Sequence, residues 1–138
     1  MQRRILGSII FAALVLSTSC SQHPDMNEPY VALADRFARA LSLGQFDVAH
    51  SLLTDREKAQ LSEASLKKEY LDMIDYGHCA AKHVEVMQAH TSWSQKKEGD
   101  VGWAYVAIAG DNFSEAVAVV VTRKPVGIGI RSIEWGRP

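Results

Sequence analysis

The sequence predicts an α+β domain, in which helices from the first half of the chain pack on one face of an antiparallel sheet of four strands from the second half. Two observations lead to this fold class. Apolar residues recur at three- and four-residue steps as far as Ile74, which is typical of amphipathic helices, whereas from Ala80 onward they alternate with polar residues, which is typical of half-buried strands. The strands follow one another across short polar turns, so neighbouring strands are expected to run antiparallel.

Four helices are expected in the first half, and each begins at a residue suited to a helix start. Pro29 opens the first helix and Gly44 ends it. Asp47 is expected to cap a short second helix. Thr54 and Glu57 match a capping box for the third helix, in which the hydroxyl and the carboxylate satisfy free backbone amides. The predicted helical ranges are 29–44, 47–53, 54–61 and 62–74.

Four strands are expected in the second half, with a polar hairpin loop at residues 93–102 between the first two. In the first strand, Val84, Val86 and Gln88 are expected to share one face. The third strand is nearly continuous Ala and Val, which predicts a central strand covered on both faces. In the last strand the apolar positions change parity across Arg131 and Ser132, which predicts a bulge. The predicted strand ranges are 80–88, 103–109, 115–122 and 128–135.

The first 19 residues have the three parts of an export signal. Arg3 and Arg4 give a positive start, an apolar run follows from Ile5 to Leu16, and small residues precede a cleavage point. A transmembrane helix needs roughly 20 apolar residues, and this run is shorter. We therefore expect cleavage, which leaves 119 residues (138 minus 19), enough for one small domain.

The stretch LVLSTSC, which ends at Cys20, resembles the signals of bacterial lipoproteins, in which a small residue precedes an invariant cysteine. Those signals usually have Leu three places before the cysteine, whereas here Ser17 holds that place and Leu16 lies one residue earlier. The resemblance implies that Cys20 is lipidated and anchors the protein to a membrane. With Ser21 rather than Asp after the cysteine, it implies the periplasmic side of the outer membrane. Ser17 and Ser19 also suit an ordinary signal peptidase, which would leave the protein free in the periplasm.

Composition argues against several kinds of partner. Removing the signal leaves 13 basic residues (15 minus 2) against 16 acidic ones, a net charge of −3. No run of Lys and Arg is longer than two residues, so we expect no nucleic-acid partner. With Cys20 acylated, Cys79 has no partner for an internal disulfide and is expected to be a small buried residue. The five histidines are scattered and no Cys-x-x-Cys occurs, so neither a metal site nor a cofactor is expected.

Three segments resemble the NTF2-like superfamily, also called cystatin-like or SnoaL-like: the helical hairpin FARALSLGQFDVAHSLLTDREKAQLS, the helix through EYLDMI, and the closing strand IRSIEWGRP. The resemblance covers nearly all of residues 29–138. It implies a curved sheet that encloses a conical pocket with its helices. The superfamily holds isomerases, dehydratases, transport factors, immunity proteins and binding domains, so the resemblance concerns the fold and not the function. The expected organisation is a signal peptide at 1–19, a lipidated terminus and tether at 20–28, and an NTF2-like domain at 29–138.

Candidate site residues are few. No residues match the Asp/His or Asp/Tyr pair of the superfamily's enzymes, and His78, Cys79 and His83 lack a third group that would orient a thiolate nucleophile. No catalytic residue is therefore assigned. Trp103 and Tyr105 point the same way along their strand, with His83 on the facing side of the neighbouring strand. These three residues are core, a partner surface or the lining of a ligand pocket.

Trp93 lies in the charged hairpin loop, where an aromatic residue serves as a recognition finger or belongs to a mobile solvated turn.

The function expected from these observations is non-catalytic binding of a protein partner in the cell envelope. An immunity protein against a periplasmic toxin is a special case of this class. A homodimer formed through the sheet is a further candidate assembly. The alternative is a small-molecule-binding or SnoaL-like enzymatic domain that uses the conical pocket.

Overall fold

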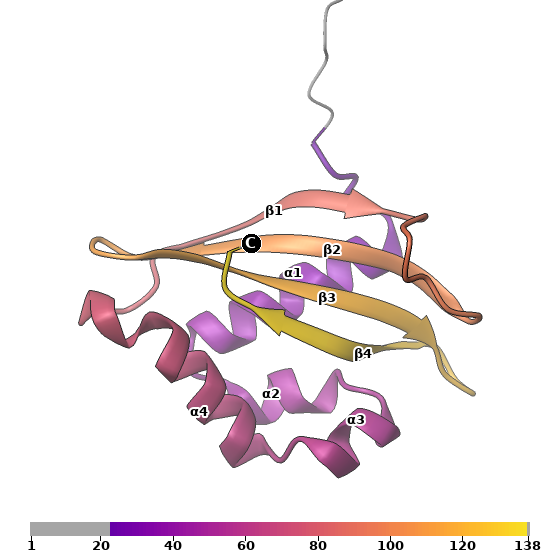
Figure 1. The fold of residues 1–138 in the computed structure, drawn as a ribbon, viewed down its shortest axis with the longest axis horizontal. Helices are drawn as coiled ribbons and strands as arrows, with labels where there is room; N and C mark the ends of the chain where they lie inside the picture. Colours follow the sequence, from indigo (N-terminus) through magenta and orange to yellow (C-terminus); the bar gives the residue numbers. More distant parts are fainter. Residues whose placement is uncertain (1–22, 138) are drawn as a thin grey trace, which may run out of the picture.

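The computed structural model describes residues 23–137, which form helices followed by a four-stranded antiparallel sheet (Figure 1). The sheet is open and its strand order is β1-β2-β3-β4, so each strand pairs with its neighbours in the sequence. The α+β class and the antiparallel order are those expected from the sequence. The elements are α1 (Pro29–Ser42), α2 (Phe46–Ser51), α3 (Asp55–Gln60), α4 (Glu63–Ile74), a 3-10 turn (Asp75–Gly77), β1 (His83–His90), β2 (Asp100–Ala109), β3 (Ser114–Arg123) and β4 (Ile128–Trp135).

Helix starts follow the local sequence with one exception. Thr54 and Ser62 cap α3 and α4, as predicted, and each hydroxyl accepts a hydrogen bond from the backbone N–H three residues later. Only half of the expected capping box forms, because the Thr54 N–H donates to the carbonyl of Ile130 at 2.8 Å. The prediction for Asp47 was wrong: Gln45 is the N-cap of α2, and Asp47 lies in its first turn. There the carboxylate faces the partial positive charge of the helix start.

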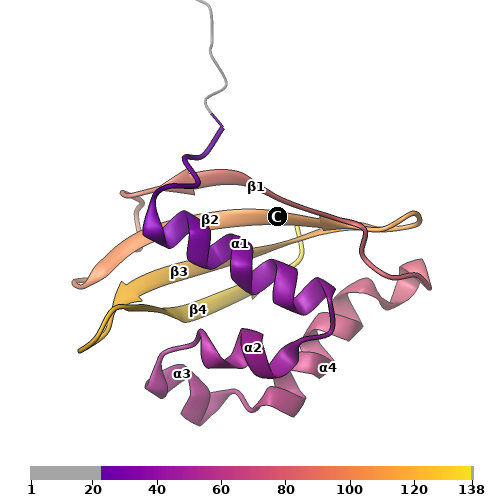
Figure 2. The same ribbon diagram turned by 180° about the vertical axis from the view of Figure 1, so that it is seen from behind.

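The helices cover one face of the sheet, and Figure 2 shows α1 in front of the strands on that face. No helix of residues 23–137 covers the opposite face, which is turned toward the viewer in Figure 1. Helix α1 crosses β2, and Gly102 permits a close approach, since a Cβ atom there would lie 2.1 Å from the Tyr30 ring. The core lies between the two layers. Its largest side chains with less than 2 % exposure are Phe37, Leu41, Leu53, Leu66, Ile108 and Ile130.

Three register shifts shape the sheet. The shift in β4 leaves Arg131 unpaired between Ile130 and Ser132, which confirms the predicted bulge. The shift in β1 inserts Met87, and a further shift at the start of β2 inserts Val101. None of the three alters the strand order.

The Met87 bulge makes one prediction wrong. Val84 and Val86 face the helices, but Gln88 pairs with Tyr105 and therefore lies on the open face. β1 also begins at His83 and not at residue 80, and β2 begins at Asp100 and not at residue 103.

Strand β3 is central, as expected, but no helix in the described part of the chain covers its second face. Val117, Val119 and Val121 point toward the helices and are fully buried. On the open face, Ala116 and Ala118 are also buried, at 1 % and 7 % exposure. These small residues are covered by larger side chains of the neighbouring strands and of the chain end, and not by a second layer.

Candidate functional site

The open face of the sheet carries the aromatic residues that the sequence singled out. Cα pairing places Trp103 opposite His90 on one side and Val120 on the other, and places Tyr105 opposite Gln88 and Ala118. Trp103 and Tyr105 are both half-buried. They therefore belong to neither the core between the layers nor a fully solvated surface.

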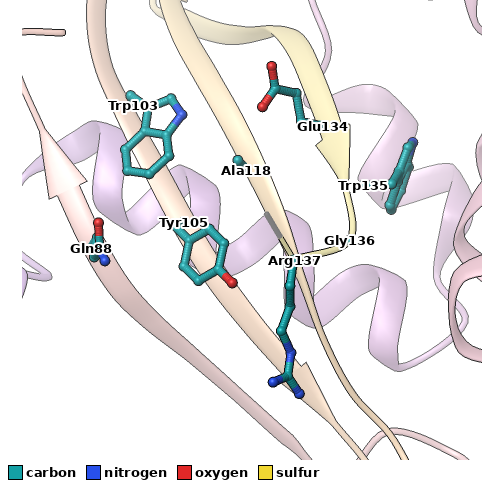
Figure 3. Close-up of a pocket in the computed structure, with 8 residues that line it drawn as sticks. All are labelled: Gln88, Trp103, Tyr105, Ala118, Glu134, Trp135, Gly136 and Arg137. Carbon is teal, nitrogen blue, oxygen red and sulfur yellow. The ribbon is translucent and has the colours of Figure 1, made fainter.

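A hollow of about 320 Å³ lies on this face (Figure 3). Its floor is the small residue Ala118 on β3. Figure 3 shows Trp103 and Tyr105 side by side along β2, with the helices behind the sheet. The residues lining it are Gln88, Trp103, Tyr105, Ala118, Glu134, Trp135, Gly136 and Arg137.

Trp103 and Tyr105 form one wall of the hollow, and His90 extends their aromatic row beyond it. The rings of His90 and Trp103 stack with their centroids 5.4 Å apart and an interplanar angle of 20°. Tyr105 continues the row, with its ring centroid 6.3 Å from that of Trp103 and again a 20° angle. The three rings thus offer one nearly continuous aromatic surface, and each is supported by its neighbour.

A second hollow of about 350 Å³ adjoins the first, because both are lined by Trp103, Ala118 and Glu134. It extends toward the β1–β2 loop, where Trp93 contributes to its wall. We call the two hollows together the open-face groove. Its remaining lining residues are Gln95, Lys97, Val120, Arg131 and Ser132.

The wall opposite the aromatic row carries charge. Glu134 is exposed and makes no side-chain hydrogen bond within residues 23–137, so its carboxylate is free to accept one from a partner. Arg137 donates from its Nη2 atom to the carbonyl of Ser114, which holds the end of the chain against the sheet. The groove therefore combines flat apolar rings on one side with a carboxylate and a guanidinium on the other.

Arg131 is held in place by a buried partner. Its Nε and Nη2 atoms donate to the two carboxylate oxygens of Asp100, both at 2.6 Å, and the Asp100 side chain is fully buried. The backbone N–H of Lys97 donates to the same carboxylate at 2.8 Å. The hydrogen bond from Arg131 lowers the pKa of Asp100, against the desolvation that would raise it, and the Asp100 carboxylate raises the pKa of Arg131. The pair fixes the loop end of the groove.

His83 lies on the same face but outside the groove. It pairs with Ala109, at the far end of β2 from Trp103, and its Nε2 atom lies 3.0 Å from a carboxylate oxygen of Glu85. The sequence-predicted residues Trp93, Trp103 and Tyr105 come together, and His83 does not join them. Cys79 is half-buried and packs against the core, and Cys20 lies outside the described residues.

Sequence reasoning missed most of the other groove residues, among them Gln88, Arg131, Glu134 and Arg137. Glu134 lies on a predicted strand, but its place on the face of Trp103 depends on how β4 pairs with β3. Trp135 lines the groove as well, although it pairs with the inward-facing Val117 and packs partly against the core. Trp135 also donates from its indole N–H to the Glu69 carboxylate on α4, at 2.6 Å. The parity change around Arg131 was a signal in the sequence that pointed to this region.

Neither hollow of the open-face groove is the conical pocket between helices and sheet that the family resemblance implies. Among residues 23–137, the core side chains between helices and sheet are buried, and the Tyr70 hydroxyl is buried there without a hydrogen-bond partner. Burial raises the pKa of Tyr70 to about 12, so it is a neutral phenol at physiological pH. A single unpaired hydroxyl gives no acid–base pair.

Metal and membrane features can be stated for the described residues. Within residues 23–137, no three His, Cys, Asp or Glu side chains lie close enough to hold a metal ion. In the same part of the chain, no helix is both long and apolar enough to cross a bilayer. The arrangement of the groove suits binding through shape, aromatic contact and hydrogen bonds.

Comparison with known proteins gives no family for this chain. No family model matches the sequence, and no curated protein matches it.

Proposed function

We propose that this protein is an exported, lipid-anchored module of the cell envelope that binds a protein partner through its open-face groove. The observation that carries the proposal is the row of Trp103 and Tyr105 on a sheet face without a covering layer. Half-buried Trp, Tyr and Arg side chains are the residues that dominate binding energy at protein interfaces. Arg131 lies at one end of the same groove.

The shape of the groove supports a macromolecular partner. Its two hollows share residues and extend across the sheet from β1 to β4, which is a longer contact than a single small ligand needs. A stable protein interface buries roughly 800 Å² on each side, so the partner would also contact the rim beyond the groove. Trp93 in the β1–β2 loop stands at this rim. An immunity protein that binds a toxin remains a special case of this proposal.

The anchor is the second part of the proposal. It rests on Cys20 and on the signal that precedes it, both read from the sequence. A Cys20→Ala variant should lose the label from radioactive palmitate while the exported domain still accumulates. Persistence of the label in that variant would refute the anchor.

Site-specific photocrosslinking tests the groove. A photoreactive phenylalanine analogue at Tyr105 should give a covalent adduct with one protein in the cells that produce the chain. Tyr76 is the matched control position, because it is an aromatic residue, 55 % exposed, at the other end of the sheet beside Glu115. The Tyr105 adduct should disappear when Trp103 is replaced by Ala, and the Tyr76 position should give none.

The outcomes separate the candidate classes. An adduct with twice the mass of the chain would support a homodimer formed through the sheet instead of a separate envelope partner. Absence of any adduct, together with a small-molecule mass that co-purifies in native mass spectrometry, would favour the alternative of a small ligand. The hollow of about 320 Å³ beside Trp103 is large enough for such a ligand.

A further inference from the structure

The two edge strands of the sheet, β4 and β1, differ in how the rest of the chain covers their backbone. At the β4 edge, the Ile130 N–H donates to the Leu52 carbonyl at 2.9 Å and the Ile130 carbonyl accepts from Thr54 at 2.8 Å. The segment between α2 and α3 therefore covers this edge. At the β1 edge, Arg39 donates to the Val84 carbonyl at 3.3 Å. Uncovered strand edges expose free backbone groups that can pair with another chain, and proteins usually protect them.

The N-terminal segment lies against the β1 edge. A turn at Asp25, in which the Glu28 N–H donates to the Asp25 carbonyl at 3.0 Å, reverses the chain before α1 begins. His23 is thereby brought to 3.8 Å from the Glu85 carboxylate on β1. Pro24 and Met26 line a small hollow with Val84 and Val86 of the same strand, next to Asp35 and Arg39 of α1. The described end of the expected tether is thus packed on the domain.

The number of residues between Cys20 and His23 limits the distance between the lipid anchor and the domain. Three peptide units separate Cys20 from His23 (23 minus 20). Even when fully extended, three residues span only about 10 Å. If the lipid is attached at Cys20, His23 and the β1 edge beside it must therefore lie next to the lipid headgroups.

The chemistry of this side suits a lipid surface. Two of its carboxylates are paired with cations, Asp35 with Arg39 at 2.8 Å and Asp111 with Lys82 at 2.6 Å. Glu85 lies 3.0 Å from a ring nitrogen of His83, and the exposed Asp25 accepts hydrogen bonds from Asn27. This side therefore keeps some negative charge and suits zwitterionic headgroups better than anionic ones. Two exposed thioether side chains belong to the same side: Met26, 46 % exposed, and Met87, 48 % exposed. Apolar contacts of this kind add to the binding that one lipid anchor provides.

We infer that the β1 edge, with residues 23–26 packed on it, is the membrane-facing surface of the domain and that its partner is the lipid headgroup layer. The inference rests on the proposed anchor at Cys20, but it does not depend on the identity of the groove's partner. The bilayer then shields the β1 edge, while α3 and β4 lie on the far side of the domain (Figure 1). The open-face groove is reached from the side, parallel to the membrane.

Energy transfer to labelled lipids tests this orientation. The full chain, made with its own signal, is reconstituted into vesicles that contain a headgroup-labelled acceptor lipid. A donor dye is placed at Met87→Cys on the β1 edge or at Arg56→Cys on α3, each in a Cys79→Ala background. His83→Cys serves as a second edge position if the Met87 variant folds poorly. Transfer from the edge positions should be several-fold greater than transfer from position 56.

A spacer variant provides the matched control. Inserting a Gly/Ser spacer of about ten residues between Gln22 and His23 adds roughly 17 Å of root-mean-square reach, so the difference between edge and far positions should collapse. Vesicle flotation is measured on each sample. Protein that floats but transfers equally from both sides would overturn the orientation and leave the anchor intact. Protein that does not float would overturn the proposed anchor, and the orientation with it.

Discussion

Replacing Asp100 by Asn is expected to destabilise the domain strongly, because it breaks a buried ion pair while preserving side-chain shape. The carboxylate accepts three hydrogen bonds, two from Arg131 at 2.6 Å and one from the Lys97 N–H at 2.8 Å. An Asn oxygen in the place of Oδ2 can keep the bonds from Arg131 Nη2 and the Lys97 N–H, but the Asn amide N–H groups then face the Arg131 Nε–H. Both Arg131 bonds lose their charged acceptor, and at about 1.5 kcal/mol each this gives a cost of about 3 kcal/mol. This agrees with the low end of the range for breaking a buried pair, as expected when Arg131 is 24 % exposed.

Thermal unfolding followed by circular dichroism measures this cost. A loss of about 3 kcal/mol corresponds to a fall in Tm of about 12 °C for a domain of this size. The matched control is Asp111→Asn, which breaks the ion pair with Lys82, whose two side chains are 66 % and 62 % exposed. Exposed pairs contribute well under about 1 kcal/mol, so Tm should change by no more than about 3 °C in the control.

The pH dependence gives a second readout of the same pair. Arg131 holds the pKa of Asp100 below its ordinary value of 3.8. A lowered carboxyl pKa contributes stability that is fully present above the unfolded pKa and is lost as pH falls through the folded pKa. The Tm difference between wild type and Asp100→Asn should therefore be constant near neutral pH and narrow below about pH 4. The reasoning would be refuted by equal Tm losses in the Asp100 and Asp111 variants. It would also be refuted if the Tm difference between wild type and Asp100→Asn stayed the same at low pH.

Three further substitutions test local features. Tyr70→Phe removes a buried hydroxyl without a partner among the described residues. The free energy of unfolding in urea should therefore stay the same or rise by about 1 kcal/mol. A clear loss of stability would mean that the hydroxyl is bonded to water. Gly102→Ala places a methyl group 2.1 Å from the Tyr30 ring and should lower the free energy of unfolding by about 1–3 kcal/mol. A second change, Tyr30→Leu, should restore part of this stability. An unchanged stability of the single variant would contradict the close packing. Thr54→Ala removes the acceptor for the Glu57 N–H at 3.2 Å and should lower stability by about 1 kcal/mol in thermal melts, whereas Thr54→Ser should not; equal stability of the two variants argues against the cap.

The sequence predicted most of the fold because its signals are local. Helix caps at Thr54 and Ser62 depend on a few neighbouring residues, and the structure has both. Alternation along β2 placed Trp103 and Tyr105 together, since side chains two residues apart share a face. The bulge at Arg131 was also predictable, because apolar residues lie on both sides of it and their parity changes.

The second bulge was missed for a physical reason. After Val84 and Val86, strand β1 continues with Met87 and Ala89, so its apolar positions change parity here too. Met87 follows Val86 directly and also fits the solvent side of an unbroken strand, so the pairing with β2 is what shows the shift. A register shift belongs to two strands and cannot be read reliably from one of them.

The groove itself depends on tertiary pairing. Its aromatic wall comes from β2, but its charged wall comes from Glu134 and Arg137, which are some thirty residues further along the chain. The run of Ala and Val in β3 predicted cover on both faces, whereas the structure buries Ala118 under neighbouring side chains instead. His83 shares the face of Trp103 but lies at the other end of the sheet, because antiparallel pairing places it opposite Ala109.

The extra residue at Met87 affects how the length of this protein can vary. If Met87 paired in regular register instead of bulging, it would lie opposite Tyr105, and Gln88 and His90 would turn inward against the core. A buried amide without a partner costs several kcal/mol, so the bulge keeps both polar residues on the open face. Deleting Met87 would leave Gln88 directly after Val86 and still opposite Tyr105, so relatives of this protein can have a strand one residue shorter here and keep the groove wall.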